Sequence, residues 1–369
     1  MKILMFNHLP APYLVEFLNQ IGKDIELTVI FKDATSFERE DSWLNYQYKS
    51  FKADYLPKSL FKKISFMFHY MMGDYDLFWN ADYSKFECIF FTFWYKLRKK
   101  IVLMHADGGI PIPRNIDPLI RFVMKQAHFF ASSGIECDKY YQYYHINPQK
   151  IFHYRFTSQT REDLLKNQCY IEQRNQYRKE LGISNEIVLF SVGQQIPRKG
   201  YDLLVQAMKD VPKSVKLFIA GGNPEPHVQQ IIDKFDLSNI FFVGFKNKDE
   251  LSKYYAASDI FVLPTRYDIW GLVINEAMSF SLPIISTEKC AAAVQFVNEF
   301  KNGLIVPIDD IESLASAINE LIENSKLRAS YAELSFESIQ EYTIENMVSD
   351  YISIFNEIKR RVNYEDSSN

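Results

Sequence analysis

Two acidic residues, Asp268 and Glu276, lie at the start of a predicted helix in the second half of the chain. An apolar run ends at Pro264, and Gly271 and Leu272 begin the helix. Glu276 then lies about 7.5 Å from Gly271 along the helix axis. The first N–H groups of a helix are unpaired and carry the positive end of its dipole, so they stabilise an anion such as a diphosphate. The two carboxylates could accept hydrogen bonds from hydroxyls at opposite ends of an extended ligand.

Both acidic residues also have a purely structural interpretation. Asp268 could cap the N-terminus of the helix, and Glu276 could lie on a solvent-exposed face. Taken alone, these residues leave the structural and the binding interpretation equally open.

A basic pair, Arg198 and Lys199, occupies a second predicted connection between a strand and a helix. The preceding apolar run ends at Gly193, and the following helix begins at Gly200. Two cations in such a loop would neutralise the charge of a diphosphate leaving group. An isolated Arg-Lys pair is more often a solvated turn, but a second loop suited to phosphate favours the binding interpretation here.

In the first half of the chain, His105 and Asp107 stand at the end of the apolar run 101–104. Ligands of open α/β sheets bind outside the carboxyl ends of the strands. His105 or Asp107 could therefore contact a sugar or an acceptor hydroxyl, and the loop Asn7–Tyr13 should line the same region. The alternative is that His105 is a structural residue at the end of its strand.

These residues are positioned by alternating strand and helix patterns, which are typical of βαβ units around parallel sheets. The first half contains apolar runs at Lys2–Phe6, Glu26–Phe31, Asp76–Trp79, Ile101–His105 and His128–Ser132. The second half contains them at Ile187–Val192, Val215–Ala220, Ile240–Val243, Ile260–Pro264 and Leu282–Ser286. The pattern predicts an α/β fold of two doubly wound, Rossmann-like domains that face each other across a cleft.

The segment 155–180 is polar and carries no strand signal, so it should hold the domain boundary. We expect residues 1–165 and residues 166–340 to form the two domains. The last predicted helices lie near 310–323 and 335–360. They would pack outside the second domain, or the C-terminal helix and tail at 341–369 would pack back on the first.

Residues 264–286 resemble the signature of the family-4 retaining glycosyltransferases, also called glycosyl transferases group 1. Asp268 stands in place of the first acid of their E-x7-E motif, and Glu276 matches the second. The resemblance implies the GT-B fold, in which residues 1–165 would be the acceptor-binding domain and residues 166–340 the nucleotide-sugar-binding domain. It also implies that Asp268 lies near the transferred sugar and that Glu276 binds the ribose hydroxyls. Lys199 matches the lysine of the family's G-R-x-x-x-x-K-G stretch, whereas Gln194 replaces its arginine, so Arg198 would supply the second charge.

Other glycines fit the same resemblance. Gly244 and Phe245 resemble the family's loop that holds the nucleobase through backbone groups, although an ordinary turn is the alternative. Gly193 ends the strand before the basic pair. No metal-binding motif stands out, so we expect Arg198, Lys199 and the helix N-terminus to replace a cation.

The implied reaction moves a sugar from a nucleoside diphosphate, UDP in our interpretation, to a hydroxyl of a glycan or lipid-linked glycan with retention of configuration. A bacterial surface-polysaccharide pathway is the expected context. One alternative is a nucleotide-sugar epimerase of the same fold. Another is a non-catalytic partner subunit, for which Asp268 and Gln194 would be the supporting departures.

Composition limits the partners. The formal net charge of −4 argues against nucleic acid as the main partner. Cys88, Cys137, Cys169 and Cys290 show no zinc-binding spacing, which favours free thiols in a reducing compartment. No apolar run approaches the roughly 20 residues of a membrane span, so we expect a cytoplasmic protein.

Two segments could still contact the membrane at its inner face. Lys58–Met72 and Trp94–Lys100 mix basic residues with large apolar ones. Such segments can lie in the interface of an anionic bilayer. Amphipathic helices that pack on their own sheet are the alternative.

Overall fold

The computed structural model describes residues 1–34, 47–82, 85–107 and 117–367. The chain divides into two compact units. Unit 1 contains Met1–Thr157 together with Ile344–Asn369, and unit 2 contains Ser158–Thr343. Each unit is an α/β structure with its own parallel sheet.

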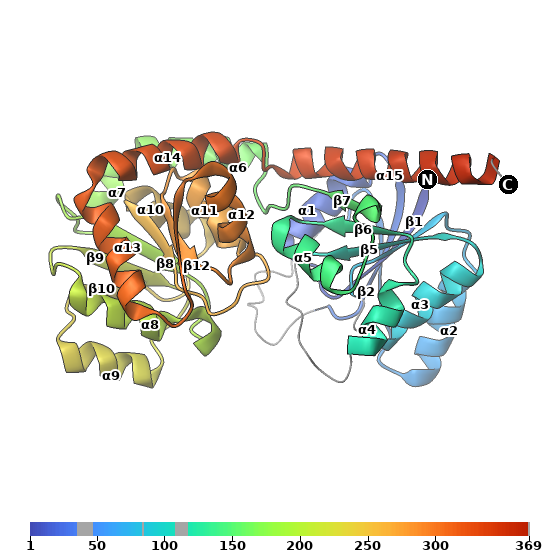
Figure 1. The fold of residues 1–369 in the computed structure, drawn as a ribbon, viewed down its shortest axis with the longest axis horizontal. Helices are drawn as coiled ribbons and strands as arrows, with labels where there is room; N and C mark the ends of the chain where they lie inside the picture. Colours follow the sequence, from blue (N-terminus) through green and yellow to red (C-terminus); the bar gives the residue numbers. More distant parts are fainter. Residues whose placement is uncertain (35–46, 83–84, 108–116, 368–369) are drawn as a thin grey trace. The chain divides into compact units, whose positions relative to one another are not determined.

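Unit 1 is built on a seven-stranded sheet in the order β3-β2-β1-β4-β5-β6-β7 (Figure 1). All its strand pairs are parallel. The strands are β1 (Lys2–Asn7), β2 (Glu26–Phe31), β3 (Lys52–Tyr55), β4 (Leu77–Asn80), β5 (Ile101–Ala106), β6 (Phe129–Ser132) and β7 (Ile151–His153). The central strands are buried on both faces, which explains their continuous apolar runs.

Helices cover both faces of this sheet. Its helices are α1 (Pro12–Ile21), α2 (Leu60–Met71), α3 (Phe86–Leu97), α4 (Asp117–Met124), α5 (Ile135–Tyr143) and α15 (Ile344–Ser367). One core joins alternate strand residues such as Phe78 and Met104 to α2, α3, α4 and α5. On the other face, α15 packs along α1. There Trp79 of β4 contacts Phe17 of α1 and Tyr351 of α15.

Unit 2 has a six-stranded parallel sheet in the order β10-β9-β8-β11-β12-β13. The strands are β8 (Val188–Val192), β9 (Lys216–Ala220), β10 (Ile240–Phe242), β11 (Ile260–Leu263), β12 (Ile284–Thr287) and β13 (Gly303–Val306). Its helices are α6 (Arg161–Glu172), α7 (Arg174–Glu180), α8 (Tyr201–Ala207), α9 (Pro226–Phe235), α10 (Lys248–Ala257), α11 (Leu272–Ser279), α12 (Ala291–Phe300), α13 (Ile311–Glu323) and α14 (Ser325–Ile339). In both units the strand order reverses beside the first strand, which is the doubly wound arrangement.

The predicted fold class of two parallel α/β sheets is confirmed. Sequence patterns missed three short strands, β3, β7 and β13. Strand β3 lies at a sheet edge with partly exposed side chains, and β7 has only three residues. Neither has an apolar run long enough to distinguish it from a loop.

The polar segment near residue 165 is helical rather than a linker. Thr160 and Asp163 form a capping box at the start of α6, so the expected boundary at 165 falls inside this helix. The unit boundary lies between Thr157 and Ser158.

The chain then returns to unit 1 near its C-terminus. The helix expected at 335–360 is two helices, because α14 ends at Ile339 and α15 begins at Ile344. Ile339 and Ile344 are both buried but belong to different units, and the break allows the chain to pass from one to the other.

Candidate functional site

In unit 2, the connection between β8 and α8 lies against the end of β11. Gly200 has a φ of +71°, and a Cβ there would lie 2.1 Å from the carbonyl oxygen of Pro264. Only glycine accepts both conditions. The Arg266 N–H donates to the Arg198 carbonyl at 2.8 Å, and the Arg198 guanidinium donates to the carbonyl of Tyr267 at 2.7 Å. These bonds bring the two loops with predicted phosphate and sugar contacts together.

The basic pair and the first acid meet at this point. The Lys199 Nζ lies 2.5 Å from Asp268 Oδ2, and the Arg198 guanidinium lies 3.8 Å from Asp268 Oδ1. The Lys199 and Asp268 side chains are 11% and 14% exposed. Two cations and a carboxylate are thus concentrated in a partly desolvated site, where charges interact more strongly than in water. The sequence did not predict that Asp268 would be the counter-ion of Lys199.

The loop before α11 holds Asp268 by its backbone. The Asp268 N–H donates to the Lys289 carbonyl at 2.9 Å. Gly271 has a φ of +97°, and a Cβ there would lie 2.7 Å from the Cys290 sulfur, so a side chain would clash. Gly271 itself is the N-cap of α11, and Leu272 is its first residue. The capping interpretation of Asp268 is therefore wrong.

Glu276 lies one turn into α11 and is partly buried. Its Oε2 accepts a hydrogen bond of 3.0 Å from the Tyr255 hydroxyl of α10. Burial raises the pKa of the Glu276 carboxyl. A carboxylate on a fully solvated helix face would show neither feature, so the surface interpretation of Glu276 is also wrong.

The ends of β8, β9 and β10 form a layer of backbone around glycines. The Gly193 N–H donates to the Ala220 carbonyl at 3.0 Å, and the Gly221 N–H donates to the Gly244 carbonyl at 2.8 Å. A Cβ on Gly221 would lie 2.1 Å from the carbonyl oxygen of Gly193. Phe245, which follows Gly244, is 65% exposed. A large aromatic ring is therefore presented beyond the end of β10.

Gln195 adds a polar atom to this layer. A Cβ on Gly222 would lie 3.2 Å from Gln195 Cγ and 3.7 Å from the Phe245 ring, so both side chains flank Gly222. The buried Gln195 Oε1 accepts no hydrogen bond from the described residues. A buried acceptor without a donor costs free energy, and a ligand that supplies the donor would recover it.

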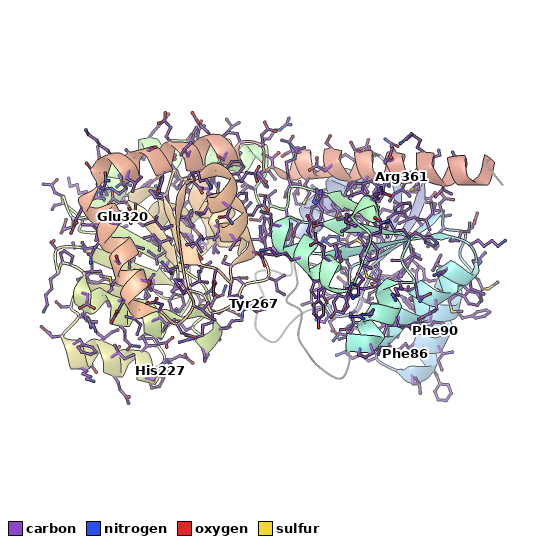
Figure 2. The ribbon with its side chains drawn as sticks, in the orientation of Figure 1. Phe86, Phe90, His227, Tyr267, Glu320 and Arg361 are labelled. Carbon is purple, nitrogen blue, oxygen red and sulfur yellow. The ribbon has the colours of Figure 1, made fainter. Side chains whose placement is uncertain are left out.

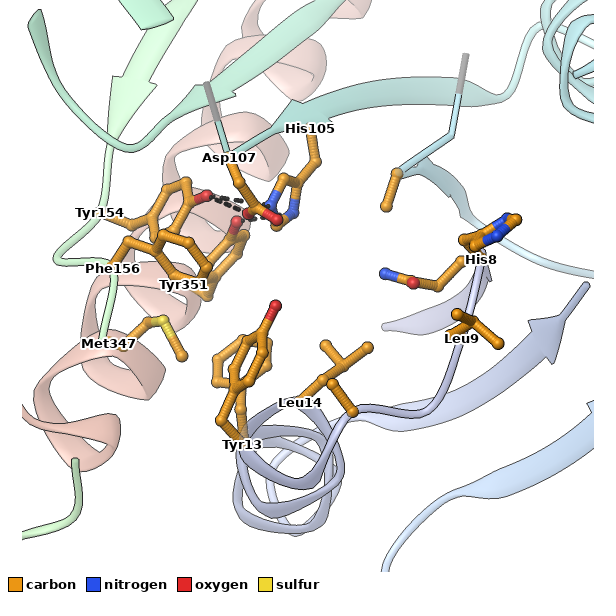
Figure 3. A pocket seen from close by; sticks show the side chains of 14 residues that line it. His8, Leu9, Tyr13, Leu14, His105, Asp107, Tyr154, Phe156, Met347 and Tyr351 are labelled. Atoms are coloured by element: carbon orange, nitrogen blue, oxygen red, sulfur yellow. Dashed lines mark hydrogen bonds and ion pairs between the residues drawn. The ribbon is translucent and has the colours of Figure 1, made fainter. Parts of the chain in front are cut away.

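Unit 1 has a cavity of about 210 Å³ at the carboxyl ends of β1 and β5 (Figure 3). The loop after β1 contributes His8, α1 contributes Tyr13, and the end of β5 contributes His105 and the following Asp107. Met347 and Tyr351 of α15 line one wall of the cavity. The two predicted residues His105 and Asp107 therefore share one cavity with the β1 loop, as their positions at strand ends suggested.

His105 is held by four side chains. The Trp79 indole can only donate a hydrogen bond, and it donates to His105 Nδ1 at 3.2 Å. The neutral ring therefore carries its proton on Nε2, which lies 2.6 Å from Asp107 Oδ1. The Tyr351 hydroxyl lies 2.9 Å from Nδ1, and the Tyr154 hydroxyl lies 2.9 Å from both Nε2 and Asp107 Oδ1. These contacts determine the tautomer and orientation of the imidazole.

Asp107 is ionised in this network. Burial alone would raise its pKa, but the contacts with His105 and Tyr154 hold the pKa of the Asp107 carboxyl below its ordinary value. The cavity thus contains a carboxylate that accepts hydrogen bonds and an imidazole whose ring N–H points at it.

The C-terminal helix brings Tyr351 to this cavity. Arg155, just after β7, makes a paired contact with Asp350: its guanidinium nitrogens lie 2.9 and 2.6 Å from the two carboxylate oxygens. Tyr351 and His105 are 246 residues apart in sequence. No local pattern connects residues so distant, which explains why the sequence analysis missed Trp79, Tyr154 and Tyr351 as partners of His105.

Two further observations concern metals and membranes. Among the described residues, no three or more His, Cys, Asp or Glu side chains are grouped so that they could hold a metal ion. Every helix in the described ranges is too short or too polar to span a bilayer.

Comparisons with known proteins relate part of this chain to a known family. Residues 173–337 match the family described as "Glycosyl transferases group 1". An uncharacterized glycosyltransferase of Methanocaldococcus jannaschii is 30% identical over 167 residues, which are 45% of this chain and 47% of that protein. The lipopolysaccharide core biosynthesis glycosyltransferase LpsE of Rhizobium meliloti is 26% identical over 169 residues, 45% of this chain and 49% of that protein. The chain thus spans about half the length of these curated relatives.

A solved structure extends the likeness to both units. The crystal structure of HepE from Anabaena in complex with UDP matches 97% of this chain and 100% of that chain, with a TM-score of 0.78 at 16% identity. At this identity the likeness shows the fold alone. Residues 173–337 are thus similar to the glycosyl transferases group 1 family, and the two doubly wound units have the fold of the GT-B glycosyltransferases.

Proposed function

We propose that this chain is a retaining glycosyltransferase that transfers a sugar from a nucleoside diphosphate, preferably UDP, to a hydroxyl of a glycan or lipid-linked glycan. The cluster of Arg198, Lys199 and Asp268 at the ends of β8 and β11 carries the proposal. It concentrates positive charge beside the N-terminus of α11, and a diphosphate leaving group needs such charge in the transition state.

The donor would extend from this cluster across unit 2. Lys199 and Arg198 would bind the phosphate oxygens, and the first N–H groups of α11, from Leu272 on, would add a partial positive charge. Glu276 would accept hydrogen bonds from the ribose hydroxyls, for which its carboxylate is already oriented by the Tyr255 hydroxyl. Phe245 presents an exposed ring that suits the flat face of a base.

The backbone around Gly193 and Gly244 suits the same donor. Because Gly193 and Gly244 have no side chains, a ligand can approach the backbone at the ends of β8 and β10 closely. Gln195 Oε1 would accept a hydrogen bond from a ligand N–H or hydroxyl. These positions would give the donor both its orientation and its selectivity.

The cavity in unit 1 would take the reacting part of the acceptor or the transferred sugar. His105 and Asp107 line it together with polar groups of the β1 loop. Asp107 is ionised and can accept the hydrogen bond of a hydroxyl, and His105 can either support Asp107 or contact the sugar. We assign Asp268 to the sugar end of the donor. Front-side attack assisted by the leaving phosphate is the mechanism that the family resemblance implies.

The relatives support a role in surface-polysaccharide synthesis, which we propose takes place in the cytoplasm. HepE is solved in complex with UDP and with UDP-glucose, and LpsE is named for lipopolysaccharide core biosynthesis. These names describe those proteins. They direct the choice of donors and acceptors to be tested first.

The proposal is tested with purified protein and a panel of nucleotide sugars, by thermal shift and by release of the nucleoside diphosphate. Glu276→Ala and Lys199→Ala should each lower turnover at least about 100-fold while leaving the fold intact. Lys209→Ala and Glu333→Ala are matched controls on exposed positions of unit 2 and should stay within about twofold of the parent protein.

Three outcomes would count against this function. Near-normal turnover in both site variants would remove the donor site from the place assigned to it. Conversion of the donor to its epimer without an acceptor would favour the epimerase alternative. Activity that EDTA abolishes and manganese restores would contradict the assigned role of Arg198 and Lys199 in place of a cation.

A further inference from the structure

The outer side of α2, α3 and α4 in unit 1 carries large apolar side chains that face solvent. On α2, Phe61 is 86% and Phe68 is 60% exposed. On α3, Phe86 and Leu97 are 72% and 77% exposed; Phe86 and its neighbour Phe90 are labelled in Figure 2. The full set is Leu60, Phe61, Ile64, Phe68, Met72, Phe86, Phe90, Leu97, Leu119 and Phe122. We name this set the α2–α4 surface.

The spacing of these residues shows that α2 has two apolar sides. Leu60, Ile64, Phe68 and Met72 recur every four residues and therefore share one face. The inward side of the helix, including Met67 and Met71, is already buried in the core of unit 1. Packing on its own sheet thus accounts for one side of α2 and leaves the other side unexplained.

The three helices form one continuous layer. Lys63 of α2 and Glu87 of α3 make an ion pair of 2.6 Å. Phe93 of α3 and Phe122 of α4 have ring centroids 5.4 Å apart, and Lys96 Nζ donates to Gln126 Oε1 at 2.9 Å beside α4. The exposed apolar side chains therefore belong to a single surface. Contiguous exposed apolar surface of this kind marks a place that contacts a partner or a membrane.

The surface is flanked by positive charge. Residues 58–72 include Lys58, Lys62 and Lys63 but no acidic residue, although the whole chain has a net charge of −4. Residues 85–100 include five basic residues and one acid, Glu87. Lys58 and Lys62 are exposed, as are Lys99 and Lys125. A basic edge around an apolar centre complements a bilayer with anionic headgroups, because lysine stems can follow the apolar side chains while the ammonium groups reach the phosphates.

We propose that the α2–α4 surface docks unit 1 on an anionic membrane, with the apolar side chains in the interface and the lysines on lipid phosphates. A second copy of the chain fits less well. A symmetric contact through this surface would place lysines opposite lysines. The surface does not depend on the proposed transferase activity and includes none of the residues assigned to donor or acceptor binding.

The test is sedimentation of the full chain with vesicles of phosphatidylcholine alone or mixed with phosphatidylglycerol. The parent protein should bind the mixed vesicles at about 50 mM salt and far less at about 500 mM, where charges are screened. Phe61→Ser/Phe68→Ser and Lys58→Glu/Lys62→Glu should each weaken binding about tenfold or more. Leu165→Ser and Lys234→Glu/Lys326→Glu change exposed residues of unit 2 and should leave binding unchanged.

Release of nucleoside diphosphate from a soluble donor should be the same in all four variants, which shows that they are folded. Binding to mixed vesicles that survives both pairs of substitutions on the α2–α4 surface would overturn the proposal. So would equal binding to vesicles without anionic lipid. Self-association in analytical ultracentrifugation that Phe61→Ser/Phe68→Ser abolishes would also overturn it, because the surface would then be a protein interface.

Discussion

From the ion pair between Lys199 and Asp268 we predict that Asp268→Asn lowers the stability of the protein but raises its affinity for UDP. In Asp268→Asn the amide is nearly isosteric with the carboxylate, but Lys199 loses its counter-ion. Breaking a fully buried ion pair costs about 3–5 kcal/mol. The two side chains retain 11% and 14% exposure, and the amide oxygen can still accept a hydrogen bond. We therefore expect the free energy of unfolding to fall by about 1–2 kcal/mol, or about 3–6 °C in Tm.

UDP should bind more tightly to the same variant, if Lys199 binds the diphosphate as proposed. Lys199 Nζ lies 2.5 Å from the carboxylate, and an ammonium–phosphate bond is about 2.8 Å long. A phosphate oxygen on Lys199 is then at most about 5.3 Å from Asp268. At an effective dielectric constant of about 40–80, removal of that repulsion is worth about 0.8–1.5 kcal/mol. The Kd of UDP should fall about four- to tenfold.

Calorimetric titration with UDP and thermal unfolding with and without UDP provide the assay. Asp268→Asn should have the lower Tm without UDP and the larger increase in Tm with it. Transfer activity should nevertheless fall, because we assign Asp268 to the sugar. The matched control is Asp202→Asn, which breaks the ion pair of 2.7 Å between Asp202 and Arg266 in the same unit. It should lower Tm without changing the Kd of UDP.

A double variant isolates the interaction. In Lys199→Met the affinity for UDP should fall, and adding Asp268→Asn should recover part of it, because the repulsion between Asp268 and the phosphate does not pass through Lys199. Weaker UDP binding in Asp268→Asn would refute the reasoning. An equal gain in Asp202→Asn would do the same, because the effect would then be one of net charge and not of the ion pair.

Two further predictions concern other contacts. Burial raises the pKa of the Glu276 carboxyl, so the ionised form lowers the stability of the folded state at any pH above that pKa. Glu276→Gln should therefore match or exceed the parent Tm at neutral pH. The same variant should bind UDP more weakly, and its affinity for UDP should no longer change with pH in the acid range. The measurements are Tm and the Kd of UDP between acid and neutral pH. A lower Tm at neutral pH together with unchanged UDP affinity would contradict this prediction. Asp350→Ala removes the paired contact with the part-buried Arg155 and should lower stability by about 2–4 kcal/mol. Proteolysis should then release α15 faster than in the parent protein, and release of α15 at the parent rate would disprove the anchoring role.

Local patterns predicted much of the donor half. Apolar runs that end at Gly193 and Pro264 became β8 and β11, and the glycines after them stand where the backbone comes close. Strand ends in a parallel sheet meet at one edge, so the proximity of the basic pair to Asp268 followed in outline from chain order. The structural alternative, in which Asp268 caps the helix, was wrong because it considered only the helix that follows Asp268.

The short strands and the path of the C-terminal helices could not be predicted from local patterns. Strands β3, β7 and β13 are held by pairing with neighbours rather than by their own composition. The division of the C-terminal helices depends on which core buries Ile339 and which buries Ile344. Such choices are made by packing between distant segments, for which a single sequence carries no periodic signal.

The sequence by itself determined the two parallel sheets, the loops that carry Arg198, Lys199 and Asp268, and the place of Glu276 on α11. These depend on hydrophobic period and on glycine at strand ends, which are local properties. Only the tertiary structure decided that Asp268 pairs with Lys199 and that Tyr351 reaches His105 from the far end of the chain. Hydrogen bonds and ion pairs act over a few ångströms in space, whatever the separation along the chain, so these partners emerged only from the packed structure.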